Sequence, residues 1–256
     1  MPGMIGIIGG SGFYSLNSNS DTEINSLSTP FSESPVTLYK SQVSGIPAIF
    51  LPRHGKDHGT PPHKVNYRAN LWALKEIEVS AIIAVNVVGG ISENMSPGTL
   101  VIPDQIIDYT WGREHTYFDT FQTEAVGEHH VDFTWPYDEG LRKILIKSAT
   151  AKQENVHAGG VYGCTQGPRL ESAAEIQRLK RDGCDIVGMT GMPEAALARE
   201  LGLPYANISL VVNWAAGLTS ETISFADISA TLDNGVSEVK EIIVDALPEF
   251  HQFIQN

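Results

Sequence analysis

Two apolar runs of the sequence lead directly into residues that could bind an anion. Residues 4–8 are followed by Gly-Gly-Ser-Gly at 9–12, where glycines let backbone N–H groups approach an anion and the serine hydroxyl adds a donor. Residues 48–51 are followed closely by Arg53 and His54, and a guanidinium can hold a phosphate through two hydrogen bonds. The glycine spacing fits neither a dinucleotide-binding fingerprint nor a Walker loop, and these glycines could equally form a tight turn.

Polar side chains also stand at the ends of three further apolar runs. Asn86 lies near the end of one run, and Thr190 and Asn213 follow two others. Open α/β sheets bind ligands outside the carboxyl ends of their strands, so these polar ends together indicate one binding crevice. Each of them alone could be structural, because a buried amide is often satisfied by neighbouring backbone.

The stretch after Arg53 is rich in Gly and Pro and contains His58, His63 and Lys64. We expect these three side chains to belong to a solvated basic loop. Their closeness to His54 raises the question of a metal, but no Asp, Glu or Cys stands at a matching ligand spacing. We therefore predict no metal site.

The elements that must position these residues alternate between strands and helices. Apolar, β-branched runs predict strands at 4–8, 36–39, 48–51, 81–88, 161–164, 186–189 and 205–212. Apolar residues at intervals of three or four predict helices at 66–77, 138–152, 172–181, 193–201 and 234–253. This alternation predicts an α/β fold, and we expect residues 1–256 to form a single domain. The irregular, aromatic segment 110–137 is typical of an interface or a lid.

Composition and net charge limit the classes of binding partner that we expect. The 256 residues include 17 Lys and Arg against 30 Asp and Glu, and the formal net charge of -13 disfavours nucleic acid and anionic membranes. No run approaches the roughly 20 apolar residues of a membrane span, and the first residues lack the features of a signal peptide. Two cysteines suit a reducing compartment, so we expect a cytoplasmic protein.

Four motifs follow one another in a recognisable order. They are Ile7-Ile8-Gly9-Gly10-Ser11-Gly12, Arg53-His54-Gly55, Gly167-Pro168-Arg169 and Gly188-Met189-Thr190-Gly191-Met192-Pro193-Glu194. Over almost its whole length the chain resembles the trimeric purine nucleoside phosphorylase and methylthioadenosine phosphorylase family. The resemblance implies a central mixed β-sheet flanked by helices. It also implies a pentosyltransferase that uses inorganic phosphate as co-substrate, needs no cofactor, and assembles as a homotrimer or a dimer of trimers.

The same resemblance implies roles for individual residues. The phosphate would be bound by Ser11, Arg53, His54, Asn86 and Thr190, Met189 would pack against the ribose, and His54 and Asn213 would be catalytic. Asn86 stands where the family commonly has a small or hydroxyl residue. Phosphate would attack C1′ of the ribose while negative charge moves onto the departing purine.

The base end resembles the phosphorylases of 6-oxopurines. Methylthioadenosine phosphorylases typically carry Asp-x-Asp where this chain has Asn213-Trp214-Ala215, and 6-oxopurine enzymes carry an Asn there together with a Glu at the position of Glu171. A carboxylate accepts from the N1–H that hypoxanthine and guanine have and adenine lacks, and an amide can donate to N7 or O6. Alternatively, Glu171 could merely begin the helix at 172–181.

The sugar end resembles methylthio-specific relatives. Inosine and guanosine phosphorylases tend to place a His near the 5′-hydroxyl, whereas the alignment places Ala226 there and leaves apolar room for a methylthio group. His130 matches a residue that such relatives lend to the pocket of a neighbouring subunit. S-methyl-5′-thioinosine is therefore the expected substrate. The alternatives are an inosine/guanosine phosphorylase, a methylthioadenosine phosphorylase and, outside enzymes, a nucleoside-binding protein.

Overall fold

The computed structural model describes residues 3–13, 15, 22–43, 45–55, 57–119, 129–152, 155–220 and 222–255, with backbone alone at 22–26, 225 and 227. Its strands are β1 (Met4–Gly9), β2 (Thr22–Thr29), β3 (Ser32–Val43), β4 (Ile46–Pro52), β5 (Val79–Gly90), β6 (Leu100–Ile102), β7 (Gln105–Asp108), β8 (Val156–Ala158), β9 (Val161–Cys164), β10 (Ile186–Gly188) and β11 (Tyr205–Trp214). Its helices are α1 (Tyr67–Glu76), α2 (Glu139–Lys152), α3 (Ala173–Arg181), α4 (Glu194–Glu200) and α5 (Phe225–Phe253), with a 3-10 turn at Pro62–Lys64.

The described strands form one mixed sheet. Its main order is β2-β3-β4-β1-β5-β10-β9-β7, and β11 pairs with both β5 and β6, which in turn pairs with β8. The pairs β1–β4, β1–β5 and β5–β11 are parallel, whereas β2–β3, β3–β4 and β5–β10 are antiparallel. The expected α/β fold with a mixed sheet flanked by helices is thereby confirmed.

Strand β5 changes its neighbour on one side part-way along its length. β1 pairs with it as far as Ala84, and β10 pairs with it from Gly89 onward. Among the described residues, 85–88 have no strand partner on that side, while β11 continues along the other side. The sheet therefore opens beside residues 85–88, and a change of neighbour of this kind is where α/β sheets bind ligands.

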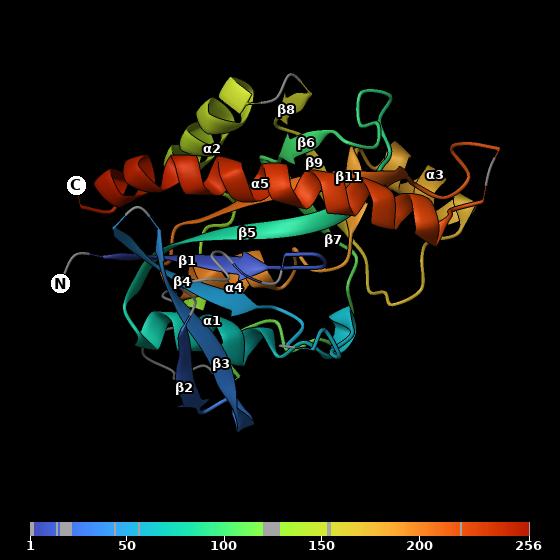
Figure 1. Ribbon diagram of the computed structural model, residues 1–256. Helices are drawn as coiled ribbons and strands as arrows, with labels where there is room; N and C mark the ends of the chain where they lie inside the picture. Colours follow the sequence, from blue (N-terminus) through green and yellow to red (C-terminus); the bar gives the residue numbers. More distant parts are fainter. Residues whose placement is uncertain are drawn as a thin grey trace.

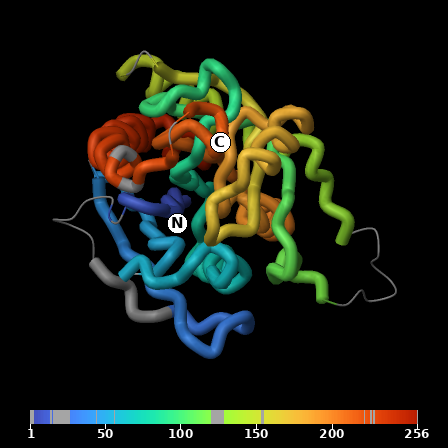
Figure 2. Tube along the Cα trace, turned by 90° about the vertical axis from the view of Figure 1, so that its right-hand side faces the viewer, coloured from blue at the N-terminus to red at the C-terminus, as the bar shows by residue number. Residues whose placement is uncertain are grey.

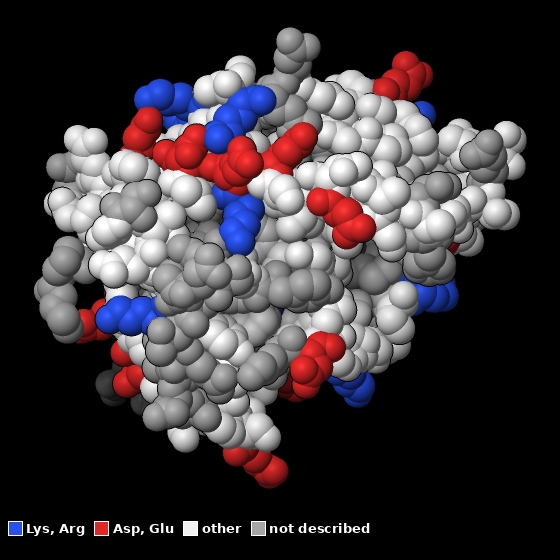
Figure 3. All heavy atoms as spheres, in the orientation of Figure 1, with Lys and Arg blue, Asp and Glu red and all other residues white. Residues whose placement is uncertain are grey.

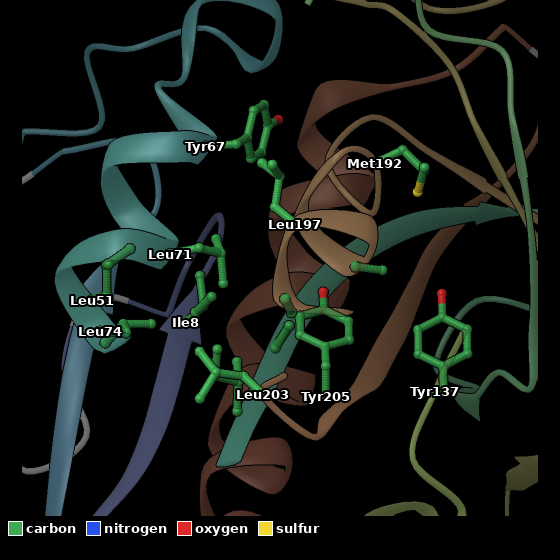
Figure 4. Packing of buried hydrophobic residues seen from close by; sticks show 14 of the residues in the cluster. Ile8, Leu51, Tyr67, Leu71, Leu74, Tyr137, Met192, Leu197, Leu203 and Tyr205 are labelled. Carbon is green, nitrogen blue, oxygen red and sulfur yellow. The ribbon is translucent and has the colours of Figure 1, made fainter. Parts of the chain in front are cut away.

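Helices cover both faces of the sheet (Figure 1). One core packs α2 and α5 against it through residues such as Leu145, Ile242 and Leu247. The other core packs α1 and α4, and Leu71, Leu197 and Tyr205 point into it (Figure 4). Figure 2 shows the same layering from the side, with the red α5 above the blue β1. These two cores hold the strand ends in fixed positions.

Helix boundaries agree closely with the expectation from sequence at α1 and α3. Asn66 caps α1 by accepting from the Ala69 N–H, and Ser172 caps α3 in a capping box with Glu175. The helix expected at 234–253 instead begins at Phe225. Its first turns were not expected because they include Ser, Thr and Asp, which are weak helix formers.

Four strands were not expected from the sequence. Three of them, β6, β7 and β8, have only three or four residues, too few to show a period. The fourth, β2, lies at the end of the main strand order and carries several polar residues. The described parts of 110–137, which are 110–119 and 129–137, contain no strand or α-helix, as their irregular composition predicted.

Charges are mixed over the face shown in Figure 3, where acidic and basic side chains lie together over α2 and α5. Lys147 pairs with Glu249 at 2.7 Å and Lys152 with Asp245 at 2.8 Å. None of the helices in the described residues is long and apolar enough to span a bilayer.

Candidate active site

A cavity of about 570 Å³ lies where the sheet opens beside β5. Strand ends, the loop at 58–62, Glu171 and the start of α5 surround it. Its lining includes Gly10, Ser11, Arg53, His54, His58, Thr60, Val87, Gly89, Glu171, Met189, Thr190, Asn213, Ala215, Ile223 and Ile228. The structure therefore brings together most of the residues that the sequence singled out, from five separate parts of the chain.

Four of the expected site residues lie outside this lining. They are Asn86, Trp214, Ala226 and His130. Asn86 is buried beneath the cavity, Trp214 ends β11, and Ala226 and His130 have exposed side chains.

Arg53 is fixed by a buried ion pair with Glu194. Its Nε donates to Oε2 at 2.6 Å and its Nη2 to Oε1 at 2.8 Å, while Nη1 donates to the Val85 carbonyl at 2.9 Å. Burial lowers the pKa of Arg53, but the Glu194 carboxylate outweighs it and raises that pKa above its ordinary value. A Cβ on Gly10 would lie 2.8 Å from Arg53 Nη1, so this glycine permits the guanidinium to reach the cavity.

Asn86 orients its neighbours instead of facing the cavity. Its Nδ2 donates to Thr190 Oγ1 at 2.7 Å, and its Oδ1 accepts from Arg53 Nη2 at 3.3 Å and from Asn207. Because Thr190 Oγ1 accepts this hydrogen bond, its own proton can be donated to an anion in the cavity. The geometry of Asn86 thus corrects the expected direct contact with phosphate to a supporting position.

His54 and His58 stand together beside Ser11. The His54 Nδ1 lies 2.7 Å from the Thr60 carbonyl, so Nδ1 carries the proton and Nε2 of the neutral ring is an acceptor. Burial, followed by the nearby positive charge of Arg53, lowers the pKa of His54 to about 4. The His58 ring lies 4.5 Å from that of His54, and its Nε2 lies 3.3 Å from Ser11 Oγ. His54 is therefore neutral near pH 7.

Glu171 and Asn213 line the same cavity, Glu171 from the loop before α3 and Asn213 from the end of β11. Glu171 Oε1 accepts from the Thr165 hydroxyl at 2.6 Å, and Asn213 Nδ2 donates to the Trp214 carbonyl at 2.7 Å. Asn213 thus keeps Oδ1 and one N–H for a ligand. Glu171 lies before the N-cap Ser172, and Glu175 is the acidic residue of the first turn of α3. The alternative that Glu171 begins that helix is therefore wrong.

The beginning of α5 supplies apolar side chains to the cavity. Ile223, just before α5, and Ile228, in its first turn, line the cavity. Ala226 is exposed, because it lies two positions from Ile228 on the helix and points in a different direction. The expectation for Ala226 is corrected in this respect, and the apolar character expected of this segment comes from the two isoleucines. His130 follows His129, whose ring stacks on Phe118 at 4.5 Å between centroids.

Comparison with known proteins identifies the family. The sequence matches the Phosphorylase superfamily over residues 4–248. The chain belongs to this superfamily.

Relatives of this superfamily member include three kinds of phosphorylase. It is 47% identical over 241 residues to a protein of Pseudomonas syringae pv. tomato named probable S-methyl-5′-thioinosine phosphorylase, covering 94% of this chain and 97% of that one. It is 42% identical over 246 residues to the 6-oxopurine nucleoside phosphorylase of Pyrococcus furiosus, covering 95% and 92%. The methylthioadenosine phosphorylase of Schistosoma mansoni in complex with adenine superposes with a TM-score of 0.88 at 34% identity, covering 97% and 92%.

Three residues of this superfamily member acquire importance only in the structure. Glu194 ends the motif at 188–194, and a charge at the start of a buried helix must be paired. His58 was interpreted as part of a solvated loop, yet it lines the cavity. The third, Arg113, lies in the irregular aromatic segment, and no spacing in the sequence points to it.

Arg113 joins the two loops that carry the base-end and phosphate-end residues. Its Nη1 donates to the carbonyls of Met189, at 2.9 Å, and Met192, at 2.6 Å. Its Nη2 donates to the carbonyls of Gln166, at 2.8 Å, and Thr165, at 3.3 Å. This buried guanidinium therefore fixes the backbone at Met189 and Met192 and at Thr165 and Gln166.

Proposed function

We propose that this protein cleaves S-methyl-5′-thioinosine with inorganic phosphate, giving hypoxanthine and 5-methylthioribose 1-phosphate. The observation that carries the proposal is the position of Glu171 and Asn213 in the same cavity as Ser11, Arg53 and Thr190. Residues that could recognise a 6-oxopurine and residues that could bind an anion therefore line one cavity. The name of the Pseudomonas syringae relative supports the same substrate.

The phosphate end supports binding of an anion by donors that are already oriented. Ser11 and Thr190 offer hydroxyls, and Arg53 offers a guanidinium held by Glu194. The neutral His54 can accept a hydrogen bond, through Nε2, from a hydroxyl that the phosphate still carries. Donors fixed before the ligand arrives lose little entropy on binding and can hold the attacking oxygen in line with C1′.

The reaction would form a bond between a phosphate oxygen and C1′ as the bond from C1′ to N9 breaks. The electron pair of that bond passes to the purine. A hydrogen bond from Asn213 to N7 or O6 would stabilise the charge on the leaving base, and Glu171 would accept from N1–H. Adenine lacks that hydrogen, so Glu171 would face a lone pair and the adenine nucleoside would bind poorly.

The sugar end supports an apolar 5′ substituent. Ile223 and Ile228 line the cavity, and neither can hydrogen-bond to a 5′-hydroxyl. An inosine/guanosine phosphorylase remains the second candidate, favoured by the similarity to the 6-oxopurine enzyme of Pyrococcus furiosus. We further propose a cytoplasmic homotrimer that uses no metal or organic cofactor, with His130 contributing to the pocket of a neighbouring subunit.

The reaction type is tested by identifying the products. Purified protein with S-methyl-5′-thioinosine and phosphate should give hypoxanthine, by chromatography, and a new sugar phosphate, by phosphorus NMR. Omitting phosphate should stop hypoxanthine release. Release at an equal rate without phosphate would show a hydrolase, and binding without any product would show a nucleoside-binding protein.

A further inference from the structure

Thr165 is held rigidly at the end of β9. Its N–H donates to the Gly188 carbonyl at 2.8 Å, and its own carbonyl accepts from Arg113 at 3.3 Å. Its backbone is therefore fixed on both sides, by a strand neighbour and by a buried guanidinium. A fixed backbone of this kind limits the directions that the side chain can take, whether or not a ligand is present.

The Thr165 hydroxyl points to Glu171. Oγ1 lies 2.6 Å from Glu171 Oε1 and 3.3 Å from the Gly188 carbonyl, which already accepts the Thr165 N–H. A hydroxyl has one proton to donate. The Glu171 carboxylate is both nearer and a stronger acceptor than the Gly188 carbonyl. The proton of Thr165 therefore goes to Glu171.

Glu171 has little else to orient it. It lies in the stretch 169–172, whose other residues are exposed, and its neighbour Arg169 pairs instead with Glu175 at 2.8 Å. Among the described residues, Thr165 is the hydrogen-bond donor to the Glu171 carboxylate. With Oε1 engaged, Oε2 is the oxygen left for a ligand in the cavity.

We propose that Thr165 is a positioning residue that sets base selectivity, orienting the Glu171 carboxylate so that Oε2 accepts from N1–H of a 6-oxopurine. The inference rests on the proposed base-reading role of Glu171. Without the hydroxyl, Glu171 would sample other rotamers and would lose entropy again on each binding event. We therefore expect kcat/KM to fall for substrates that carry N1–H and to stay nearly unchanged for substrates that lack it.

The test is a double-mutant cycle between the two residues. Thr165→Val removes the hydroxyl and keeps the shape, and Thr165→Ser keeps the hydroxyl as the matched control. Values of kcat/KM with phosphate are measured for S-methyl-5′-thioinosine and S-methyl-5′-thioadenosine. We expect T165V to lower the first about ten-fold and to change the second by less than about two-fold, with T165S close to wild type. In a Glu171→Ala background, T165V should not change kcat/KM for either nucleoside any further.

The outcomes separate the two proposals. Equal loss for both substrates in T165V, or a T165V effect that persists without Glu171, would overturn the positioning role. If T165V does not fold, Thr165→Ala is measured in the same cycle and judged by the same criteria. If E171A leaves the preference between the two nucleosides unchanged, the base-reading role of Glu171 itself fails. If E171A abolishes the preference while T165V preserves it, only the inference about Thr165 fails.

Discussion

Glu194 holds the guanidinium of Arg53 through two hydrogen bonds, Nε to Oε2 at 2.6 Å and Nη2 to Oε1 at 2.8 Å. Both side chains are 1% exposed, and Tyr205 donates a third hydrogen bond to the same carboxylate at 2.9 Å. Glu194 opens α4 and Arg53 follows β4, so the pair fastens the phosphate end of the cavity to two elements.

Glu194→Gln should be strongly destabilising. The substitution keeps the shape of the side chain but leaves the buried charge of Arg53 unpaired, which costs about 3–5 kcal/mol. The free energy of unfolding, measured with urea, checks this. Glu249→Gln is the matched control, because its pair with Lys147 is exposed and should be worth less than about 1 kcal/mol. Equal effects of the two variants would contradict the structural importance of the buried pair.

Asn86→Ala should weaken the use of phosphate selectively. It removes the hydrogen bonds that orient Thr190 and Arg53, and the loss of about 1 kcal/mol predicts a KM for phosphate raised about five-fold. The KM for the nucleoside should change little. Asn94→Ala, at an exposed amide, is the control. A parallel rise of both KM values would instead indicate a general disturbance of the cavity.

The local pattern of the sequence was enough to place the strand ends that form the cavity. An apolar run precedes each of Ser11, Arg53, Thr190 and Asn213. Such runs can be identified from the sequence without any tertiary information. The side chains that contact and hold these residues could not be predicted from the sequence. Arg113 lies 76 residues before Met189 along the chain, and only the folded loops bring its guanidinium to that carbonyl.

The position of His58 on the cavity could not be predicted from the sequence either, although His58 is only four residues from His54. It adopts a left-handed backbone conformation, with φ of 52°, in the loop that places its ring on the cavity beside Ser11. Neither that turn nor the contact follows from the spacing of the histidines. The missed strands β6, β7 and β8 depend likewise on neighbours in the sheet and not on their own short sequences.

Stability should fall as the pH is lowered from about 6.5 to about 4 because of His54. Its pKa is the ordinary value of 6.5 in the unfolded chain and about 4 in the folded protein, so the unfolded state binds the proton first as the pH falls. The stability that burial of the neutral ring provides is present above pH 6.5 and is lost as the pH falls toward 4, by roughly 3 kcal/mol. Urea unfolding at several pH values gives the slope. His54→Gln should flatten this slope, and an unchanged slope would show that His54 titrates normally.

Asn213→Asp combined with Glu171→Ser should shift the preference toward 6-aminopurines. The exchange removes the acceptor for N1–H and supplies a carboxyl that can accept from a 6-amino group or share a proton with N7. The ratio of kcat/KM for S-methyl-5′-thioadenosine to that for S-methyl-5′-thioinosine should rise by at least about ten-fold relative to wild type. Each single variant serves as a control, and an unchanged ratio in the double variant would remove the base-reading roles of both residues.

The central claim is most directly tested by comparing four nucleosides on the purified wild-type protein. Values of kcat/KM with saturating phosphate are measured side by side for S-methyl-5′-thioinosine, S-methyl-5′-thioadenosine, inosine and guanosine. We predict that S-methyl-5′-thioinosine leads the other three by at least about ten-fold, since only it satisfies both Glu171 and the apolar sugar end. A lead for inosine or guanosine would contradict the role given to Ile223 and Ile228, and a lead for S-methyl-5′-thioadenosine would contradict the roles given to Glu171 and Asn213.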